Sequence, residues 1–126
     1  EKNNAGDKPV VNYIQLIGSP VSARFARGTA DYSSETNPNA RVIKVFTRSE
    51  FTDGQEGYYA VSHKFFVERP YYFRIRGTNA EMNSPGETDE NGNPLRDSLK
   101  GKNNASLAWS DLWFYSNPIF VELQKN

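Results

Sequence analysis

The sequence contains no cysteine, and only one histidine and one methionine, among its 126 residues. Without cysteine there is no disulfide framework, no thiolate metal site and no cysteine nucleophile. The single histidine, His63, leaves a histidine-based zinc site or a Ser-His-Asp triad without partners, and neither a Gly-x-Ser-x-Gly nor a His-Glu-x-x-His motif accompanies it. We therefore expect no catalytic residue, and we expect His63 to lie at the surface or to pack near a strand end.

The sequence also lacks net charge and long apolar runs. Lys and Arg number 15, and so do Asp and Glu, so no overall field exists to hold a polyanion and nucleic acid is not an expected partner. The apolar stretches fall far short of the roughly 20 residues that span a bilayer, and no signal-like segment opens the chain. We expect a soluble chain without membrane insertion.

Aromatic residues are abundant, with 8 Phe, 7 Tyr and 2 Trp, and they favour pleated strands over helices. No window shows apolar residues at helical spacing with caps at both ends. The expected strands cover residues 10–17, 23–26, 42–47, 58–61, 64–67, 71–77, 107–115 and 118–123. Seven or eight short strands predict an all-β, antiparallel, immunoglobulin-like β-sandwich with a long loop before the last strands.

The chain length fits one domain, which we place at residues 10–126. Residues 1–9 are polar and have little to pack, which is typical of a linker that follows an upstream domain or a removed export signal. Residues 78–106 form a long connection rich in turn-forming residues. We expect this loop to be mostly ordered, to lie over one end of the sandwich and to contact a neighbour.

Residues 71–77 alternate cleanly and place Phe73 and Ile75 toward a core. Val45 and Ile119 occupy apolar positions of two other strands, so we expect all four side chains to share one core. Because residues 42–47 are apolar on both faces, that strand is expected in the middle of a sheet.

Arg74 and Arg76 fall on the outward face of the same strand. Two neighbouring guanidinium groups suit a phosphate or carboxylate ligand. Pairing with carboxylates on adjacent strands is the interpretation that we favour for them.

Residues 87–97 alternate oxygen-bearing side chains around a glycine, an arrangement that suits a calcium ion. The candidate ligands are Asp89, Asn91, Asn93 and Asp97. The loop lacks the closing Glu of an EF-hand, and the alternative is a solvated turn whose Asn and Asp side chains bond their own backbone. A structural calcium is the only cofactor that the sequence suggests.

Aromatic residues crowd one segment near the end of the chain. Trp109, Trp113 and Tyr115 share one face of the expected strand, and sugar-binding modules stack such side chains on pyranose rings. Packing in the core is the alternative that we favour. Asn104-Ala105-Ser106 fits the N-glycosylation triplet, which arises often by chance.

Two parts of the sequence resemble known β-sandwich domains. Residues 72–79 and 116–121 are similar to the last two strands of fibronectin type III and related immunoglobulin-like sandwiches. Residues 76–79, 87–95 and 111–121 together resemble the C-terminal sandwich of exported bacterial proteins that carry a PHP-type metal-dependent phosphoesterase domain. PHP-type catalysis needs a cluster of histidines and carboxylates, which one histidine cannot supply, so no catalytic residue is carried over.

The resemblance implies a non-catalytic accessory or interaction domain of an exported bacterial protein. It would lie in the periplasm or at the cell surface, attached to a phosphoesterase-like catalytic domain or as part of a lipoprotein. The alternative is a carbohydrate-binding module that uses the C-terminal aromatic residues, with carbohydrate as its partner. A small enzyme is a third hypothesis, against which the single histidine and the absence of cysteine count.

Overall fold

The computed structural model describes residues 6, 10–22, 24–34, 37–54, 58–95 and 112–124. Its strands are β1 (Tyr13–Pro20), β2 (Arg41–Thr47), β3 (Thr52–Asp53), β4 (Tyr59–Ala60), β5 (Tyr71–Thr78), β6 (Trp113–Tyr115) and β7 (Ile119–Val121). Every strand pair is antiparallel, and the only helical element of the described residues is a 3-10 turn, η1 (Arg48–Glu50). The predicted all-β, antiparallel, sandwich-like class is confirmed.

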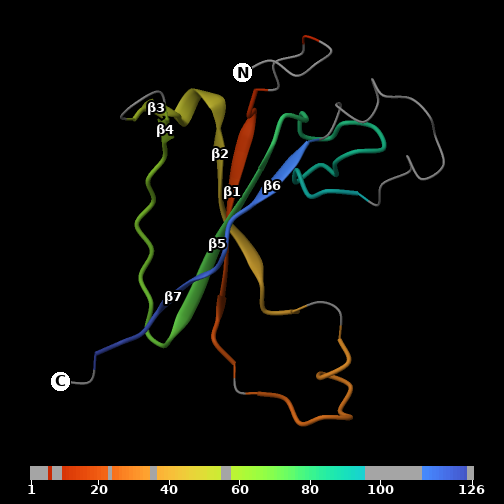
Figure 1. The fold of residues 1–126 in the computed structure, drawn as a ribbon, viewed down its shortest axis with the longest axis vertical. Helices are drawn as coiled ribbons and strands as arrows, with labels where there is room; N and C mark the ends of the chain where they lie inside the picture. The colour runs from red at the N-terminus through yellow and green to blue at the C-terminus, as the bar shows by residue number, and fades with distance from the viewer. Residues whose placement is uncertain are drawn as a thin grey trace.

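Five strands form the main sheet, in the order β2-β1-β5-β6, with β7 also paired to β5. β6 pairs with the end of β5 at Arg76–Thr78 and β7 with its beginning at Tyr71–Phe73, so the two short strands follow one another along the same edge (Figure 1). β3 and β4 pair separately as a two-stranded sheet.

The register of the main sheet defines its two faces, because residues directly opposite one another point to the same side. Gln15 of β1 lies opposite Val45 on one side and Arg76 on the other. The side that carries Arg74 and Arg76 is called the arginine face here. It also carries Tyr13, Gln15, Ile17, Val45, Trp113 and Tyr115.

The opposite side, called the phenylalanine face, carries Phe46, Phe73 and Ile75. Residues 61–69, which are extended as far as Val67 and bend at Glu68 and Arg69, lie over it and are called the covering segment (Figure 1). The Phe65 ring packs 5.5 Å from that of Phe73, centroid to centroid, and His63 lies 6.4 Å from Phe46. The main sheet and the covering segment are the two layers of the structure.

Several expectations about single strands are corrected by the structure. β2 lies at the edge of the sheet and not in its middle, and residues 24–26 and 61–69 form no strand. Val45 lies on the arginine face, opposite the side that carries Phe73 and Ile75. Ile119 lies on the same face as Phe73 but is 70% exposed. It belongs to β7, a short strand at the edge of the main sheet. The predicted four-residue core is therefore wrong for Val45 and Ile119.

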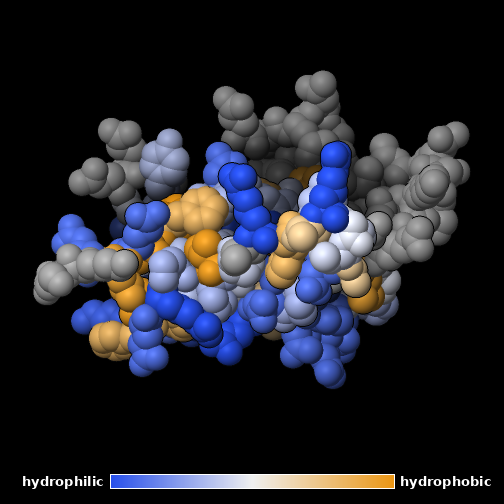
Figure 2. All heavy atoms as spheres, turned by 90° about the horizontal axis from the view of Figure 1, so that it is seen from below, coloured by the Kyte–Doolittle hydropathy of each residue, from blue (hydrophilic) through white to orange (hydrophobic). Residues whose placement is uncertain are grey.

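The described part of the long loop, residues 79–95, folds back onto the arginine face at the β1 end that carries Tyr13. The Tyr13 hydroxyl donates to the Gly92 carbonyl at 2.9 Å, and Gln15 Nε2 donates to the Asn91 carbonyl at 3.0 Å. These bonds allow Gln15 to be fully buried, since a buried amide is tolerated where its hydrogen bonds are made. Seen from below, hydrophobic and hydrophilic residues are interspersed on the surface (Figure 2).

Candidate functional site

Arg76 lies at the centre of the arginine face. Its Nε donates to Gln15 Oε1 at 2.5 Å, and one terminal nitrogen donates to Asn93 Oδ1 at 2.6 Å. The guanidinium carbon lies 5.7 Å from the ring centroid of Trp113, within the range of a cation–π contact. Three elements, β1, β6 and the loop, therefore hold this charge in one position.

Burial shifts the pKa values of two groups in this cluster. Desolvation lowers the pKa of Arg76, although nearby Tyr115, Tyr13 and Asp89 oppose that change. Desolvation also raises the pKa of Tyr13 to about 12, against the opposing charge of Arg76. The centre of the site is thus a fixed cation beside a phenol that stays protonated well into the alkaline range.

Trp113 and Tyr115 form an aromatic pair next to Arg76. Their rings are stacked with centroids 6.4 Å apart, and Trp113 also meets Tyr13 edge to face at 6.2 Å. Trp113 is half-buried and its buried Nε1 has no hydrogen-bond partner within the described residues, whereas Tyr115 is 54% exposed. The prediction that these two side chains share a face is confirmed; Trp109 lies outside the described residues.

A groove of about 780 Å³ lies beside this cluster. Ile17 and Val45 line it together with Arg74, Arg76 and Asn93. Arg74 is exposed, and it makes no ion pair in the part of the chain that the structure describes.

The residues opposite Arg74 and Arg76 test the expectation that these arginines pair with carboxylates on adjacent strands. The register places Ile17 opposite Arg74, and Gln15 and Tyr115 opposite Arg76. The expectation of carboxylates on the adjacent strands is therefore wrong, because these neighbours are apolar, amide or phenolic groups. The charge of Arg74 faces the groove and the solvent instead.

The predicted calcium loop brings Asp89, Asn91 and Asn93 together as a tight turn. Asp89 Oδ1 accepts the backbone N–H groups of Asn91 and Asn93 at 2.9 and 2.7 Å, and its Oδ2 accepts the Asn93 side-chain amide at 2.9 Å. The hydrogen bonds from Asn93 hold the pKa of Asp89 below its usual value. Asp97 lies outside the described residues. In the described ranges no group of three or more His, Cys, Asp or Glu side chains is placed to hold a metal ion, and the calcium site stays a prediction.

His63 is exposed on the covering segment, on the other side of the sheet from this cluster. Gln15, by contrast, is a central residue of the site that sequence reasoning missed. Its signal was a polar side chain on the otherwise mostly apolar face of the first strand, between Tyr13 and Ile17. No helix within the described residues is long and apolar enough to cross a membrane.

Comparison with protein-family models, with curated proteins and with solved structures finds no match to this chain. The resemblance to the sandwich of PHP-type phosphoesterases therefore stays a prediction. The site must be interpreted from its own chemistry.

Proposed function

We propose that this chain is a non-catalytic binding module whose arginine face recognises a carbohydrate chain that carries carboxylate groups. The observation that supports it best is Tyr115, an exposed aromatic ring next to a fixed Arg76 and to Arg74, which makes no ion pair among the described residues. Uronic acids present both an apolar ring face and a carboxylate, and the arginine face offers Tyr115 for the first and the two arginines beside the groove for the second.

The aromatic part of the site suits a pyranose ring. Tyr115 is more than half exposed, and Trp113 stacks against it. Because Trp113 is in turn held by Tyr13 and Arg76, the platform loses little side-chain entropy when a ligand arrives. Exposed aromatic side chains combine a large apolar area with a polar tip, which suits a ligand of mixed polarity.

The charged part of the site suits a carboxylate. Arg76 uses two of its five N–H groups to bind Gln15 and Asn93, and three remain. Arg74 retains its whole guanidinium group, which binds carboxylates through two parallel hydrogen bonds. The two arginines are two residues apart on β5, so their side chains lie about 7 Å apart along the strand, close to the size of one sugar ring.

The cellular setting belongs to the same proposal and rests on the sequence resemblance. We propose that the module accompanies a catalytic domain of an exported bacterial protein, in the periplasm or at the cell surface, and holds that domain near its substrate. The phosphoesterase character of that neighbour has no support beyond the resemblance.

A titration with neutral and uronic-acid oligosaccharides, followed by calorimetry and tyrosine and tryptophan fluorescence, tests this function. We expect Tyr115→Ala to weaken binding of all glycans at least about tenfold, the equivalent of about 1.4 kcal/mol. Arg74→Gln should weaken only the acidic glycans. Tyr58→Ala and Arg69→Gln, at exposed positions away from the arginine face, are the matched controls and should leave binding unchanged.

Two results would contradict the proposal. One is the absence of binding to every glycan by the intact chain at millimolar ligand. The other is an equal loss of glycan affinity in Tyr115→Ala and in its control Tyr58→Ala, which would show that the aromatic platform makes no specific contribution to binding.

A further inference from the structure

The covering segment runs extended as far as Val67 and bends at Glu68 and Arg69, and its backbone pairs with nothing among the described residues. It belongs to no sheet, and no backbone hydrogen bond is recorded for any of its nine residues within the described part of the chain. Unpaired extended backbone is a template for another strand, and proteins usually cover or pair it. The second layer of this molecule is therefore an extended segment, not a strand, and both of its backbone edges are unpaired among the described residues.

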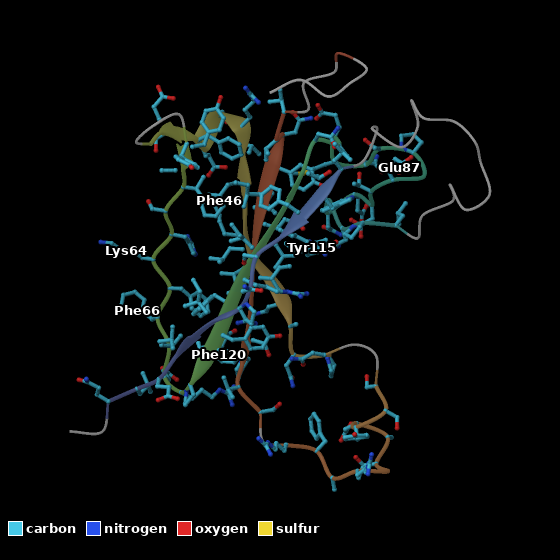
Figure 3. The ribbon with its side chains drawn as sticks, in the orientation of Figure 1. Phe46, Lys64, Phe66, Glu87, Tyr115 and Phe120 are labelled. Carbon is cyan, nitrogen blue, oxygen red and sulfur yellow. The ribbon has the colours of Figure 1, made fainter. Side chains whose placement is uncertain are left out.

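The side chains of the covering segment alternate as they would in a paired strand. Phe65 and Val67 are half-buried, and Phe65 packs on the phenylalanine face. Lys64 and Phe66 point away from the sheet, and Phe66 is 92% exposed (Figure 3). Glu68 is exposed as well. An outward phenylalanine between a cation and an anion resembles one half of an interface more than a solvated surface.

We propose that the covering segment pairs antiparallel with the same segment of a second copy of this chain, about a two-fold axis at Phe66. In that register Phe66 lies opposite the partner's Phe66. Lys64 lies opposite the partner's Glu68, and by symmetry the pair occurs twice. Opposite charges and aromatic rings placed directly across two strands stabilise their pairing.

The charges of Lys64 and Glu68 indicate both the register of the pairing and the identity of the partner strand. Shifting the axis to Phe65 places Lys64 opposite the partner's Phe66, and shifting it to Val67 places Phe66 opposite the partner's Glu68. Of these three axes, only the one at Phe66 places Lys64 and Glu68 opposite each other, whereas Arg69 then lies opposite the partner's His63. A segment that complements itself in this way indicates a second copy rather than an unrelated strand.

Charge reversal tests the register with a built-in control. Sedimentation of the intact chain from micromolar to millimolar concentration should show a dimer. Lys64→Glu alone and Glu68→Lys alone each create two like-charge pairs, and we expect each to raise the dimer Kd roughly tenfold. The double variant restores the pairs with reversed sign, so its Kd should return to within about threefold of the original.

A mixture of the two single variants is a sharper form of the same test. Lys64→Glu has two acidic residues where Glu68→Lys has two basic ones, so the mixed dimer should form in preference to either homodimer. Lys64 and Glu68 are both exposed, and circular dichroism will check that each variant stays folded.

Cysteine cross-linking measures the register directly, because the chain has no cysteine of its own. Under mild oxidation Phe66→Cys should give a disulfide dimer, since residues opposite one another lie about 4.5–5.5 Å apart between their Cα atoms. Ser62→Cys is the control: its two copies would lie eight residues apart along the pair, or about 27 Å, and should not cross-link.

A chain that stays monomeric at millimolar concentration overturns the proposal and leaves the open edges to a strand of another protein. A dimer whose Kd ignores both charge reversals, or a Ser62→Cys variant that cross-links as fast as Phe66→Cys, overturns it as well. The interface lies on the opposite side of the sheet from the proposed sugar groove, so loss of glycan binding and loss of the dimer are separate outcomes.

Discussion

Replacing Tyr13 by Phe removes one hydroxyl from the buried end of β1, and its effect can be worked out from the structure. Tyr13 is 2% exposed, and its hydroxyl donates to the Gly92 carbonyl at 2.9 Å. The substitution loses that hydrogen bond and leaves the carbonyl without its partner, at a cost of about 1–3 kcal/mol. We expect Tyr13→Phe to lower the free energy of unfolding by this amount at pH 8, measured by urea denaturation.

The cost should depend on pH, because burial raises the pKa of Tyr13 from its ordinary value of 10.0 to about 12. The folded state holds this proton more tightly than the unfolded state. Stability from protonated Tyr13 is therefore fully present below about pH 10 and is lost as the pH rises through about 12. Two pKa units correspond to about 2.7 kcal/mol, so the intact chain should approach the stability of Tyr13→Phe, or fall below it, near pH 12.

The control is Tyr58→Phe, at a side chain that is 72% exposed, which should change stability by less than about 0.5 kcal/mol at pH 8. A difference between the intact chain and Tyr13→Phe that stays constant from pH 8 to pH 12 would refute the assignment of Tyr13 as a buried, raised-pKa donor.

Four other substitutions test the packing and the turn. Gly77→Ala should cost about 1–3 kcal/mol in urea denaturation, because its Cβ would collide with the Phe114 ring; unchanged stability would contradict this contact. Phe73→Ala should cost about 2–4 kcal/mol and Ile119→Ala less than about 1 kcal/mol, since Ile119 is 70% exposed; equal losses would contradict the assigned burial. Asp89→Asn should reduce the loss of stability on acidification from pH 7 to pH 3: hydrogen bonds within its turn lower the pKa of Asp89, so its contribution is present above about pH 4 and lost below it.

Strand positions were predictable where alternation was strong. Residues 71–77 show a clear two-residue period, and β5 covers Tyr71–Thr78. Residues 42–47 are rich in β-branched side chains, and β2 covers Arg41–Thr47. In both cases the local pattern agrees with the final pairing, so little depended on distant contacts.

The phase and position of β2 could not be predicted from its sequence. Both faces of this strand are apolar, so the pattern does not say whether Val45 or Phe46 points to a given side. The pairing of β1 with β2 also shifts between Leu16 and Ile17, where Ile17 pairs with Val42 and Ile43 is left as the extra residue. A bulge of this kind depends on the partner strand and leaves no signature in one segment.

Only part of the site was visible in the sequence. Trp113 and Tyr115 were identified because residues two apart on a strand share a face. The contacts of Arg76 with Gln15 and Asn93 span 61 and 17 residues of sequence and depend on how the loop folds back. For Asp89 the sequence offered a metal or a self-bonded turn, and the turn follows from local geometry alone.

Among the described residues, the largest fully buried side chains, Gln15, Ser19 and Thr78, are polar. Exposing apolar surface raises the heat capacity of a protein on unfolding, whereas exposing polar surface lowers it. These enclosed amide and hydroxyl groups therefore reduce the heat-capacity increment of unfolding relative to apolar side chains of the same size. To that extent they flatten the stability curve, so that the free energy of unfolding varies less between a cold environment and a warm one.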